Sequence, residues 1–317
     1  MGLKKRDHTP VVWQVSSIHL NNRTFISGVL LNKAPFSFSK KTGKLQHAWK
    51  VVLSYFTKVY ANKKIWITTN LSTQTTFTDS FGSFFIFTTH QAQGTIDIRT
   101  TAQGRPLTIM QNYPVEFLNT DSPFDIISDI DDTIIVSHTA SFLQRIRTIL
   151  FKLPFERKTV KYAAQLFEES EKLHARLYYV SKSESNLFEL IASIIHANQL
   201  PKGVMILTPY LSIRQLMTSK KGFDFKANNI KFILENTGNK KYILLGDDTQ
   251  KDMEVYAKII KDHPERILKV YIRKTKSKSS IMQNTLWQKL KSTGVPTLYF
   301  DHDAEIDINS ELIKLDV

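Results

Sequence analysis

The stretch FDIISDIDDTII, residues 124–135, joins a mostly apolar run to an acidic turn. Three carboxylates, those of Asp129, Asp131 and Asp132, fall within four residues at the point where a strand should end. Like charges this close disfavour ionising all three side chains unless a cation lies between them. A divalent metal ion is the simplest such cation, so the stretch predicts a buried strand that ends at a metal site.

Further mostly apolar runs follow this first strand along the chain. They are ARLYYVS (175–181), GVMIL (203–207), KYILLG (241–246) and ILKVYI (267–272). Each is followed by a polar turn and mostly by a helical period, which is typical of a parallel sheet buried on both faces by helices. We predict a Rossmann-like α/β domain over residues 119–317. Ligands of such sheets bind beyond the carboxyl ends of the strands, where Asp129 falls.

Residues 1–118 have a different residue pattern. Short runs rich in Thr and in β-branched or aromatic residues alternate with polar turns. The runs are TFISGVLL (24–31), KVVLSYFTKVY (50–60), KIWITTNL (64–71), TQTTFTD (73–79), SFFIFTT (83–89), TIDIRTT (95–101) and YPVEFL (113–118). They predict an N-terminal all-β, sandwich-like domain. The polar connector 119–123 separates it from the α/β domain.

Composition narrows the possible partners and compartments. The chain of 317 residues has no cysteine, which excludes disulfides and thiolate metal sites. No run of eighteen apolar residues and no apolar signal segment is present, so we expect a soluble, cytoplasmic protein without a transmembrane segment. The net charge of +14 predicts attraction to a polyanion, which is nucleic acid, an anionic membrane surface or a phosphorylated substrate.

Polar groups suited to phosphoryl transfer follow the strand-like runs. Asp129 suits a nucleophile or metal ligand, and Asp131 suits an acid that protonates a leaving oxygen and then activates water. Ser181 ends the second run, Lys226 precedes the fourth, and a second acidic turn (246–252) follows it. Singly, each group has an ordinary explanation as a helix cap, a turn residue or a surface lysine. Together they supply a nucleophile, an acid, metal ligands and groups for phosphate charge.

The order D-x-D-x-T, strand-end Ser, Lys and G-D-x-x-x-x-D resembles the haloacid-dehalogenase-like phosphohydrolases. The segments SDIDDTI, YYVSKSESNLFELI, ILLGDDTQKDMEVYAKI and ERILKVYIR are similar to one branch of them, the actin-patch phosphatidate phosphatases and their bacterial relatives. The similarity covers about residues 124–273. It implies a haloacid-dehalogenase-like fold and a phosphoric monoester hydrolase of lipid metabolism that converts phosphatidate to diacylglycerol.

The resemblance also assigns roles to the residues that handle the phosphoryl group. Asp129 is the implied nucleophile, which becomes an aspartyl-phosphate, and Asp131 is the implied general acid and base. Thr133 is implied to orient the acidic loop at the phosphate, while Ser181 and Lys226 hold the transferring phosphate.

The same resemblance implies Mg2+ as the cofactor. Its ligands would be Asp129, the main-chain carbonyl of Asp131, Asp247 and Asp252. Asp132 and Asp248 receive no firm role.

A small helical cap is predicted near residues 138–172. The segment 141–155 places apolar residues on one helical face, namely Phe142, Leu143, Ile146, Ile149, Leu150 and Leu153. This pattern suits a cap helix packed on its own domain, and it equally suits an interfacial helix that contacts anionic lipid at the membrane periphery.

Two other functions stay open at this point. The same chemistry suits a soluble phosphometabolite or a nucleic-acid phosphate end. Alternatively, the chain is a basic, non-catalytic adaptor for membrane or nucleic acid, although an adaptor needs neither Asp129 nor Asp131. The sequence also departs from its relatives after the second strand, with Lys182-Ser183-Glu184, and before the site lysine, with Phe225. These departures leave the substrate preference open.

Overall fold

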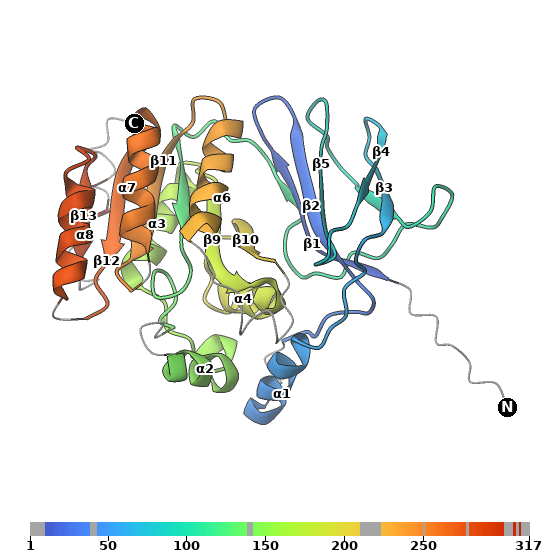
Figure 1. Ribbon diagram of the computed structural model, residues 1–317, viewed down its shortest axis with the longest axis horizontal. Coiled ribbons are helices and arrows are strands. Elements are labelled where there is room, and N and C mark those ends of the chain that lie inside the picture. The colour runs from blue at the N-terminus through green and yellow to red at the C-terminus, as the bar shows by residue number, and fades with distance from the viewer. Residues whose placement is uncertain are drawn as a thin grey trace.

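The structure is a computed structural model that describes residues 10–38, 43–137, 142–209, 223–249, 251–276, 279–300, 307–308 and 311. In these ranges the chain forms a β-rich N-terminal part and an α/β part that lie side by side (Figure 1). The fold class predicted from the sequence is therefore confirmed.

The α/β part is built on a six-stranded parallel sheet with the order β10-β9-β8-β11-β12-β13. The strands are β8 (Phe124–Ser128), β9 (Leu177–Glu184), β10 (Val204–Thr208), β11 (Lys241–Asp247), β12 (Ile267–Arg273) and β13 (Thr297–Phe300). The first five of them coincide with the apolar runs predicted to be strands. β8 and most of β11 are buried, as expected for strands covered on both faces.

Helices cover both faces of this sheet. They are α3 (Lys161–Lys172), α4 (Phe188–Ala197), α6 (Phe223–Asn236), α7 (Asp252–Asp262) and α8 (Ile281–Lys291), with short 3-10 turns η2 (Ser185–Leu187) and η3 (Pro264–Arg266). Right-handed crossovers put α3 and α4 on one face and α6, α7 and α8 on the other, in agreement with Figure 1. The chain leaves β8 toward β9 and leaves β11 toward β12, so the strand order reverses between the neighbours β8 and β11. Ligands bind at such a switch point.

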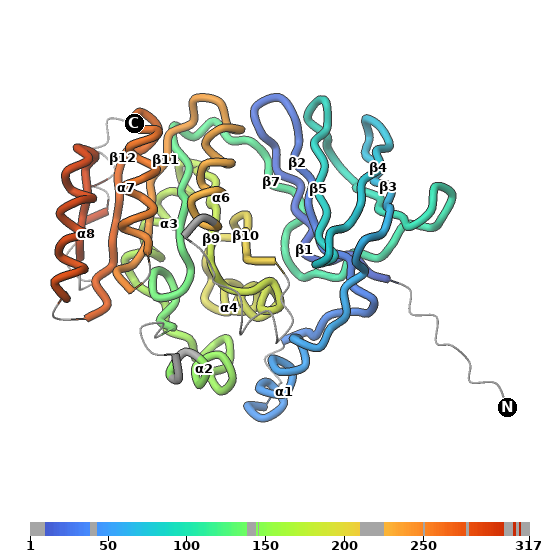
Figure 2. The backbone as a smooth tube through the Cα atoms, in the orientation of Figure 1, coloured from blue at the N-terminus to red at the C-terminus, as the bar shows by residue number. Residues whose placement is uncertain are grey.

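The N-terminal part contains two sheets, of order β5-β2-β1-β7 and β4-β3-β6 (Figure 2). The strands are β1 (Val11–His19), β2 (Thr24–Leu31), β3 (Lys64–Thr68), β4 (Thr73–Phe77), β5 (Ser83–Phe87), β6 (Asp97–Arg99) and β7 (Glu116–Phe117). Side chains from both sheets form one buried cluster, namely Val12, Val15, Ile26, Leu30, Ile65, Ile67, Phe84, Ile86 and Ile98. This shared core is the sandwich-like packing that the sequence predicts.

One predicted strand is wrong. The run 50–60 is not a strand, because Lys44–Ser54 form the helix α1. His47, Val51 and Ser54 are its buried side chains, at a spacing that places them on one helical face. The β-branched and aromatic residues of the run favour a strand locally, but packing against neighbouring elements overrides that preference. β1 and β13 were not predicted.

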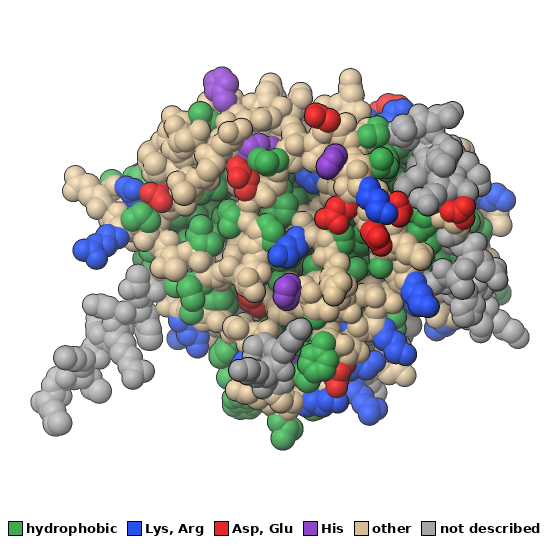
Figure 3. All heavy atoms as spheres, turned by 180° about the vertical axis from the view of Figure 1, so that it is seen from behind, with side chains coloured by type: hydrophobic (Ala, Val, Ile, Leu, Met, Phe, Trp, Pro, Cys, Tyr) green, Lys and Arg blue, Asp and Glu red, His purple; other side chains and the backbone are tan. Residues whose placement is uncertain are grey.

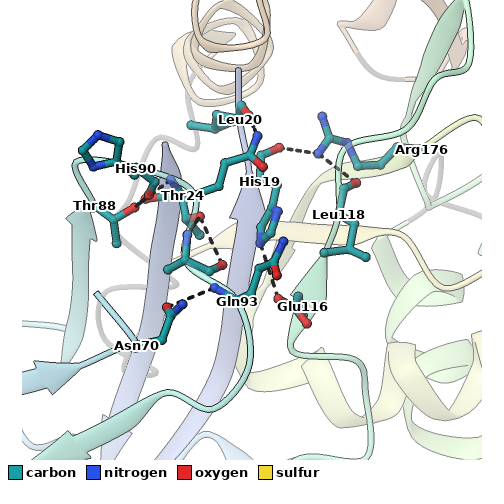
Figure 4. A network of polar contacts seen from close by, with 12 residues as sticks. His19, Leu20, Thr24, Asn70, Thr88, His90, Gln93, Glu116, Leu118 and Arg176 are labelled. Atoms are coloured by element: carbon teal, nitrogen blue, oxygen red, sulfur yellow. Dashed lines mark hydrogen bonds and ion pairs between the residues drawn. The ribbon is translucent and has the colours of Figure 1, made fainter. Parts of the chain in front are cut away.

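The two parts share a buried junction around Arg176 (Figure 4). The Arg176 guanidinium donates hydrogen bonds to the carbonyl oxygens of His19, at 2.6 Å, and Leu118, at 3.3 Å. Elsewhere, the Trp13 indole donates to the Glu189 carboxylate at 3.1 Å. The main buried cluster contains side chains of both parts, so the domain boundary near residues 118 and 119 stays a prediction.

The predicted cap region contains α2 (Phe142–Phe151) and η1 (Pro154–Glu156) before α3. α3 packs on the six-stranded sheet and is not part of a cap. The ring centroid of Tyr162 on α3 lies 5.3 Å from that of Tyr271 on β12. α2 lies beside α1, away from the sheet (Figures 1 and 2). Ile149 and Leu150 pack against the core, whereas Ile146 is exposed. Ser141 and the side chains of Phe142 and Leu143 lie outside the described residues. Within the described ranges, no helix has both the length and the apolarity needed to cross a bilayer.

Candidate active site at the carboxyl edge of the sheet

The acidic loop is positioned by β8 and β11. The backbone N–H of Asp129 donates to the carbonyl oxygen of Leu245 at 2.9 Å, which continues the pairing of the two strands past Ser128. Asp132 then adopts a left-handed backbone with φ of 57°, a conformation that aspartate tolerates better than most residues. Its carboxylate accepts the N–H of Ser137 at 2.8 Å. Asp132 therefore closes the turn that presents Asp129 and Asp131.

Three buried carboxylates and one buried ammonium meet at the switch point. Oxygens of Asp129, Asp247 and Asp252 lie within 4.8 Å of one another, and all three side chains are fully buried. Lys226, which is 1% exposed, places its Nζ 3.2 Å from Oδ1 of Asp129 and forms a second ion pair with Asp252. One ammonium cannot neutralise three carboxylates, so the cluster favours a further cation.

Burial and charge shift the pKa values of this cluster. Burial raises the pKa of Asp129 to about 7; the Lys226 ammonium opposes the shift, and the carboxylate of Asp252 adds to it. Burial also raises the pKa of Asp247 well above its ordinary value, again with a contribution from Asp252. Burial lowers the pKa of Lys226, but the carboxylates of Asp129 and Asp252 outweigh that effect and leave it above the ordinary lysine value. The neighbouring carboxylates therefore favour the charged form of Lys226.

The second acidic turn is held by hydrogen bonds from backbone N–H groups and from one side-chain hydroxyl. Thr249 donates both its N–H and its hydroxyl to Oδ1 of Asp247, and Asp252, at the start of α7, accepts the N–H of Asp247 at 3.2 Å. Gly246 makes this close approach possible. A Cβ added there would lie 2.7 Å from Oδ2 of Asp252 and 2.8 Å from Cε2 of Tyr256.

We expect Gly246→Ala to destabilise the protein and to displace Asp252. Overpacking of a buried position costs about 1–3 kcal/mol, so chemical denaturation should show a lower free energy of unfolding by that amount. Gly43→Ala is a suitable control, because a Cβ at Gly43 meets nothing within 4 Å. Equal stabilities of the two variants would contradict the tight packing at Gly246.

The Asp248 carboxylate accepts hydrogen bonds from neighbouring segments and does not belong to the cluster of Asp129, Asp247 and Asp252. Its Oδ1 accepts the N–H of Thr275 at 3.0 Å and the hydroxyl of the same residue at 2.6 Å. Its Oδ2 accepts the Tyr299 hydroxyl at 2.8 Å. These bonds tie the end of β11 to the segment after β12.

The end of β9 reaches the acidic loop through two serines. The Ser183 hydroxyl donates to Oδ2 of Asp131 at 2.5 Å, and the Ser183 N–H donates to the Ser181 hydroxyl oxygen at 3.1 Å. Ser181 is thus linked to Asp131 by two hydrogen bonds that pass through Ser183. Thr133 is also buried, and its hydroxyl has no hydrogen-bond partner among the described residues. The structure brings the predicted residues to one edge of the sheet, but their catalytic, phosphate and metal roles stay predictions.

Sequence reasoning missed three residues near this site. Ser183 orients Asp131, and Lys182 lies within electrostatic reach of the cluster, because burial and the Lys226 ammonium lower its pKa. Arg157, after η1, is 4% exposed. Burial lowers the pKa of Arg157 to about 10, and the Asp131 carboxylate opposes that shift. Lys182 and Ser183 directly follow Ser181, so the sequence offered a signal for both of them. No local signal in the sequence marked Arg157.

The donor set of the cluster fits a hard divalent cation. Asp129, Asp247 and Asp252 offer only carboxylate oxygens, which are the ligands that Mg2+ prefers in proteins. The chain has no cysteine, which excludes a site with thiolate ligands. The described residues therefore fit a metal site of this kind without identifying the ion.

Fold and motifs together define the class. An open parallel sheet carries D-x-D-x-T after the strand at the switch point and G-D-x-x-x-x-D after its neighbour, which is the arrangement expected from the resemblance to haloacid-dehalogenase-like phosphohydrolases. Residues 124–274, just under half of the chain, match the family model "Phosphatidate phosphatase APP1, catalytic domain", so this part of the chain is similar to that family.

Two curated relatives match as well. Phosphatidate phosphatase APP1 of Saccharomyces cerevisiae is 30% identical over 217 residues, which cover 62% of this chain and 34% of that protein. An uncharacterized protein of Schizosaccharomyces pombe is 24% identical over 148 residues, covering 47% of this chain and 24% of that protein. The chain therefore spans well under half the length of these relatives.

One solved structure is weakly similar to this chain. The HAD domain of the effector protein Lem4 from Legionella pneumophila aligns with 61% of this chain and 93% of that chain, at 13% identity and a TM-score of 0.28. Similarity at this level carries no argument about fold or function.

Proposed function

We propose that the protein is a Mg2+-dependent phosphatase that hydrolyses a phosphomonoester through an aspartyl-phosphate on Asp129. The observation that carries this proposal is the meeting of Asp129, Lys226, Asp247 and Asp252 at the switch point of the sheet. A buried cluster of this charge is costly for stability. A function that uses a nucleophile, a cation and a phosphate explains why the chain tolerates it.

In this mechanism Asp129 attacks the phosphorus atom, and the bond from phosphorus to the leaving oxygen breaks. The Lys226 ammonium lies 3.2 Å from the attacking carboxylate and favours its ionised form. Ser181, which lies inside β9 and not at its end, and Lys226 would also contact the oxygens of the transferring phosphoryl group. A Mg2+ ion held by Asp129, Asp247 and Asp252 would supply positive charge for both carboxylate and phosphate oxygens.

Asp131 is suited to both proton transfers. It is only partly buried, and the Ser183 hydroxyl holds one of its carboxylate oxygens. Protonated Asp131 gives its proton to the leaving oxygen in the first step. In the second step it takes a proton from water, which attacks phosphorus and breaks the bond to Asp129. Inorganic phosphate and the free alcohol are the products.

We expect Asp131→Asn to separate these two steps. With an activated aryl phosphate, whose leaving group needs no proton, Asp129 still attacks, so a burst of phosphoenzyme should form and then stall. Steady-state turnover should fall on the order of 10²-fold or more, since water attack lacks its base. Rapid-quench measurement of the burst checks this result. A variant with normal turnover would show that Asp131 is not the base.

We further propose phosphatidate as the substrate, with diacylglycerol as the product. Support comes from the family match over residues 124–274 and from the net charge of +14, which favours anionic lipid. The decisive experiment measures hydrolysis by the purified protein of three kinds of substrate. These are phosphatidate in mixed micelles, soluble phosphoesters and 5′-phosphorylated oligonucleotides. Preference for phosphatidate supports the proposal, and preference for either other substrate replaces it with the corresponding alternative.

Loss of activity on all three substrates would favour a non-catalytic adaptor. That alternative is disfavoured because binding alone does not require a buried carboxylate cluster. Location in the cytoplasm, with peripheral contact to a membrane, is part of the same proposal.

A further inference from the structure

Helix α1 exposes a stripe of large apolar side chains. Leu45 is 83% exposed, Trp49 63%, Val52 37% and Phe56, just beyond the helix, 59%. Their spacing places them along one side of the helix. Single exposed apolar residues are ordinary, but a continuous stripe of this size marks an interaction site.

The opposite side of α1 fixes this stripe in place. His47 is buried, and its Nε2 lies 3.1 Å from the carbonyl oxygen of Ile149 on α2. At the other end of the helix, the Asn186 amide donates to the carbonyl oxygen of Ser54 at 3.3 Å. The stripe is therefore held outward by a helix that is anchored at both ends.

The neighbouring helix extends the apolar surface. Ile146 and Phe151 on α2 are exposed, and so is Phe155 in η1. α1 and α2 form the end of the molecule farthest below the sheets in Figure 1. We refer to the exposed residues Leu45, Trp49, Val52, Phe56, Ile146, Phe151 and Phe155 as the α1–α2 face.

The charges around this face are almost all positive. The sequence has no aspartate or glutamate from residue 8 to residue 78, and none from residue 133 to residue 155. Lys44, Lys58 and Arg147 are exposed and lie one or two positions in the sequence from Leu45, Phe56 and Ile146. Glu156 is an acid beside this face, and it pairs with Lys44 at 3.0 Å. Figure 3 shows hydrophobic and Lys/Arg side chains together along the lower edge, where α1 and α2 lie.

We propose that the α1–α2 face docks the protein on an anionic lipid bilayer. The apolar stripe would enter the boundary between head groups and acyl chains, while the surrounding lysine and arginine side chains contact lipid phosphates. Trp49 suits this depth, because tryptophan prefers the membrane interface. A protein partner needs no such one-sided positive charge, so the charge favours the bilayer as the occupant.

This face is connected to the candidate active site. The hydroxyl of Tyr55, at the end of α1, donates to Oε2 of Glu184 at 3.4 Å. Glu184 ends β9, the strand that carries Ser181 and Ser183. Docking would therefore bring the carboxyl edge of the sheet close to the lipid surface. The docking surface rests on its own residues, whereas its use in phosphatidate turnover rests on the proposed function.

The test compares vesicle binding of matched variants. Trp49→Ser should weaken binding to vesicles of phosphatidylcholine with phosphatidylserine by about tenfold or more. Phe77→Ser, which alters an equally exposed phenylalanine (65%) on β4, should leave binding unchanged. Binding by the unmodified chain should also weaken as salt is raised and on vesicles of phosphatidylcholine alone. Equal binding by the two variants would overturn the proposal.

A second measurement does not depend on loss of binding. Brominated lipids should quench the fluorescence of the unmodified chain, and Trp49→Phe should keep vesicle binding while losing most of that quenching. Quenching unchanged in Trp49→Phe would contradict insertion of this face. If Trp49→Ser instead dissociates an oligomer and leaves vesicle binding intact, the face is a protein interface and the proposal is wrong.

Hydrolysis of a soluble aryl phosphate separates this inference from the proposed function. Trp49→Ser should retain it, because Trp49 is an exposed residue of α1 and is not part of the acidic cluster of Asp129, Asp247 and Asp252. Vesicle binding without any hydrolysis would leave the docking surface standing and remove the phosphatase. Hydrolysis of the aryl phosphate without vesicle binding that depends on Trp49 would support the phosphatase and overturn the docking surface.

Discussion

Asp129→Asn should reduce phosphatase turnover to the background rate, a loss on the order of 10³-fold or more. The substitution keeps the size of the side chain, but the amide is not an anionic nucleophile. No aspartyl-phosphate should then form, so hydroxylamine should release no phosphate from acid-quenched enzyme. Steady-state hydrolysis of an aryl phosphate and phosphoenzyme trapping measure the two effects.

Deamidation would regenerate Asp129, so mass spectrometry must accompany this experiment. Asp97→Asn, on the partly exposed side chain of β6, is the matched control and should keep full activity. Circular dichroism should show both variants folded. Substantial turnover in intact Asp129→Asn would show that another residue is the nucleophile and that the proposed mechanism is wrong.

Removal of divalent metal should abolish activity nearly as completely. Without a bound cation, the carboxylates of Asp129, Asp247 and Asp252 repel one another and the phosphate, and Lys226 balances only part of their charge. Excess chelator should therefore stop hydrolysis, and added Mg2+ should restore it. Metal that binds only the folded state should also raise the melting temperature, by mass action.

Asp247→Asn separates metal binding from other effects of chelation. The variant should fold, but its melting temperature should respond to Mg2+ only at much higher concentration than that of the unmodified chain. Full hydrolysis in excess chelator, or an unchanged Mg2+ response in Asp247→Asn, would argue against a metal site at this cluster.

The sheet of the α/β part was predictable because its strands are buried on both faces. Such strands appear in the sequence as short apolar runs, and β8 to β12 match them. Since carboxyl ends of parallel strands share one edge, the polar residues after those runs could be expected to meet there. Asp129, Lys226, Asp247 and Asp252 do meet.

Features that depend on distant contacts were not predictable. The run 50–60 has strand-forming residues, yet packing of His47 and Val51 makes its first part helical. Ser183 matters because of a hydrogen bond to Asp131, 52 positions earlier in the chain. Arg157 lies within electrostatic reach of Asp131 because the segment after η1 pairs with the end of the acidic loop, through the bridge between Ile135 and Thr159. The sequence around Ser183 or Arg157 does not indicate that either residue lies near Asp131.

The junction at Arg176 has a consequence for how the chain can be divided. Its guanidinium satisfies carbonyl oxygens of His19 and Leu118 and forms a 3.5 Å ion pair with Asp125, which is wholly buried at the start of β8. Cutting the chain before residue 119 would leave that cation facing water and strip the aromatic neighbours Trp13 and Tyr113 from Phe188. Because these contacts cross the boundary, we expect a fragment limited to the 151 residues of the family match (124–274) to be less stable than the whole chain.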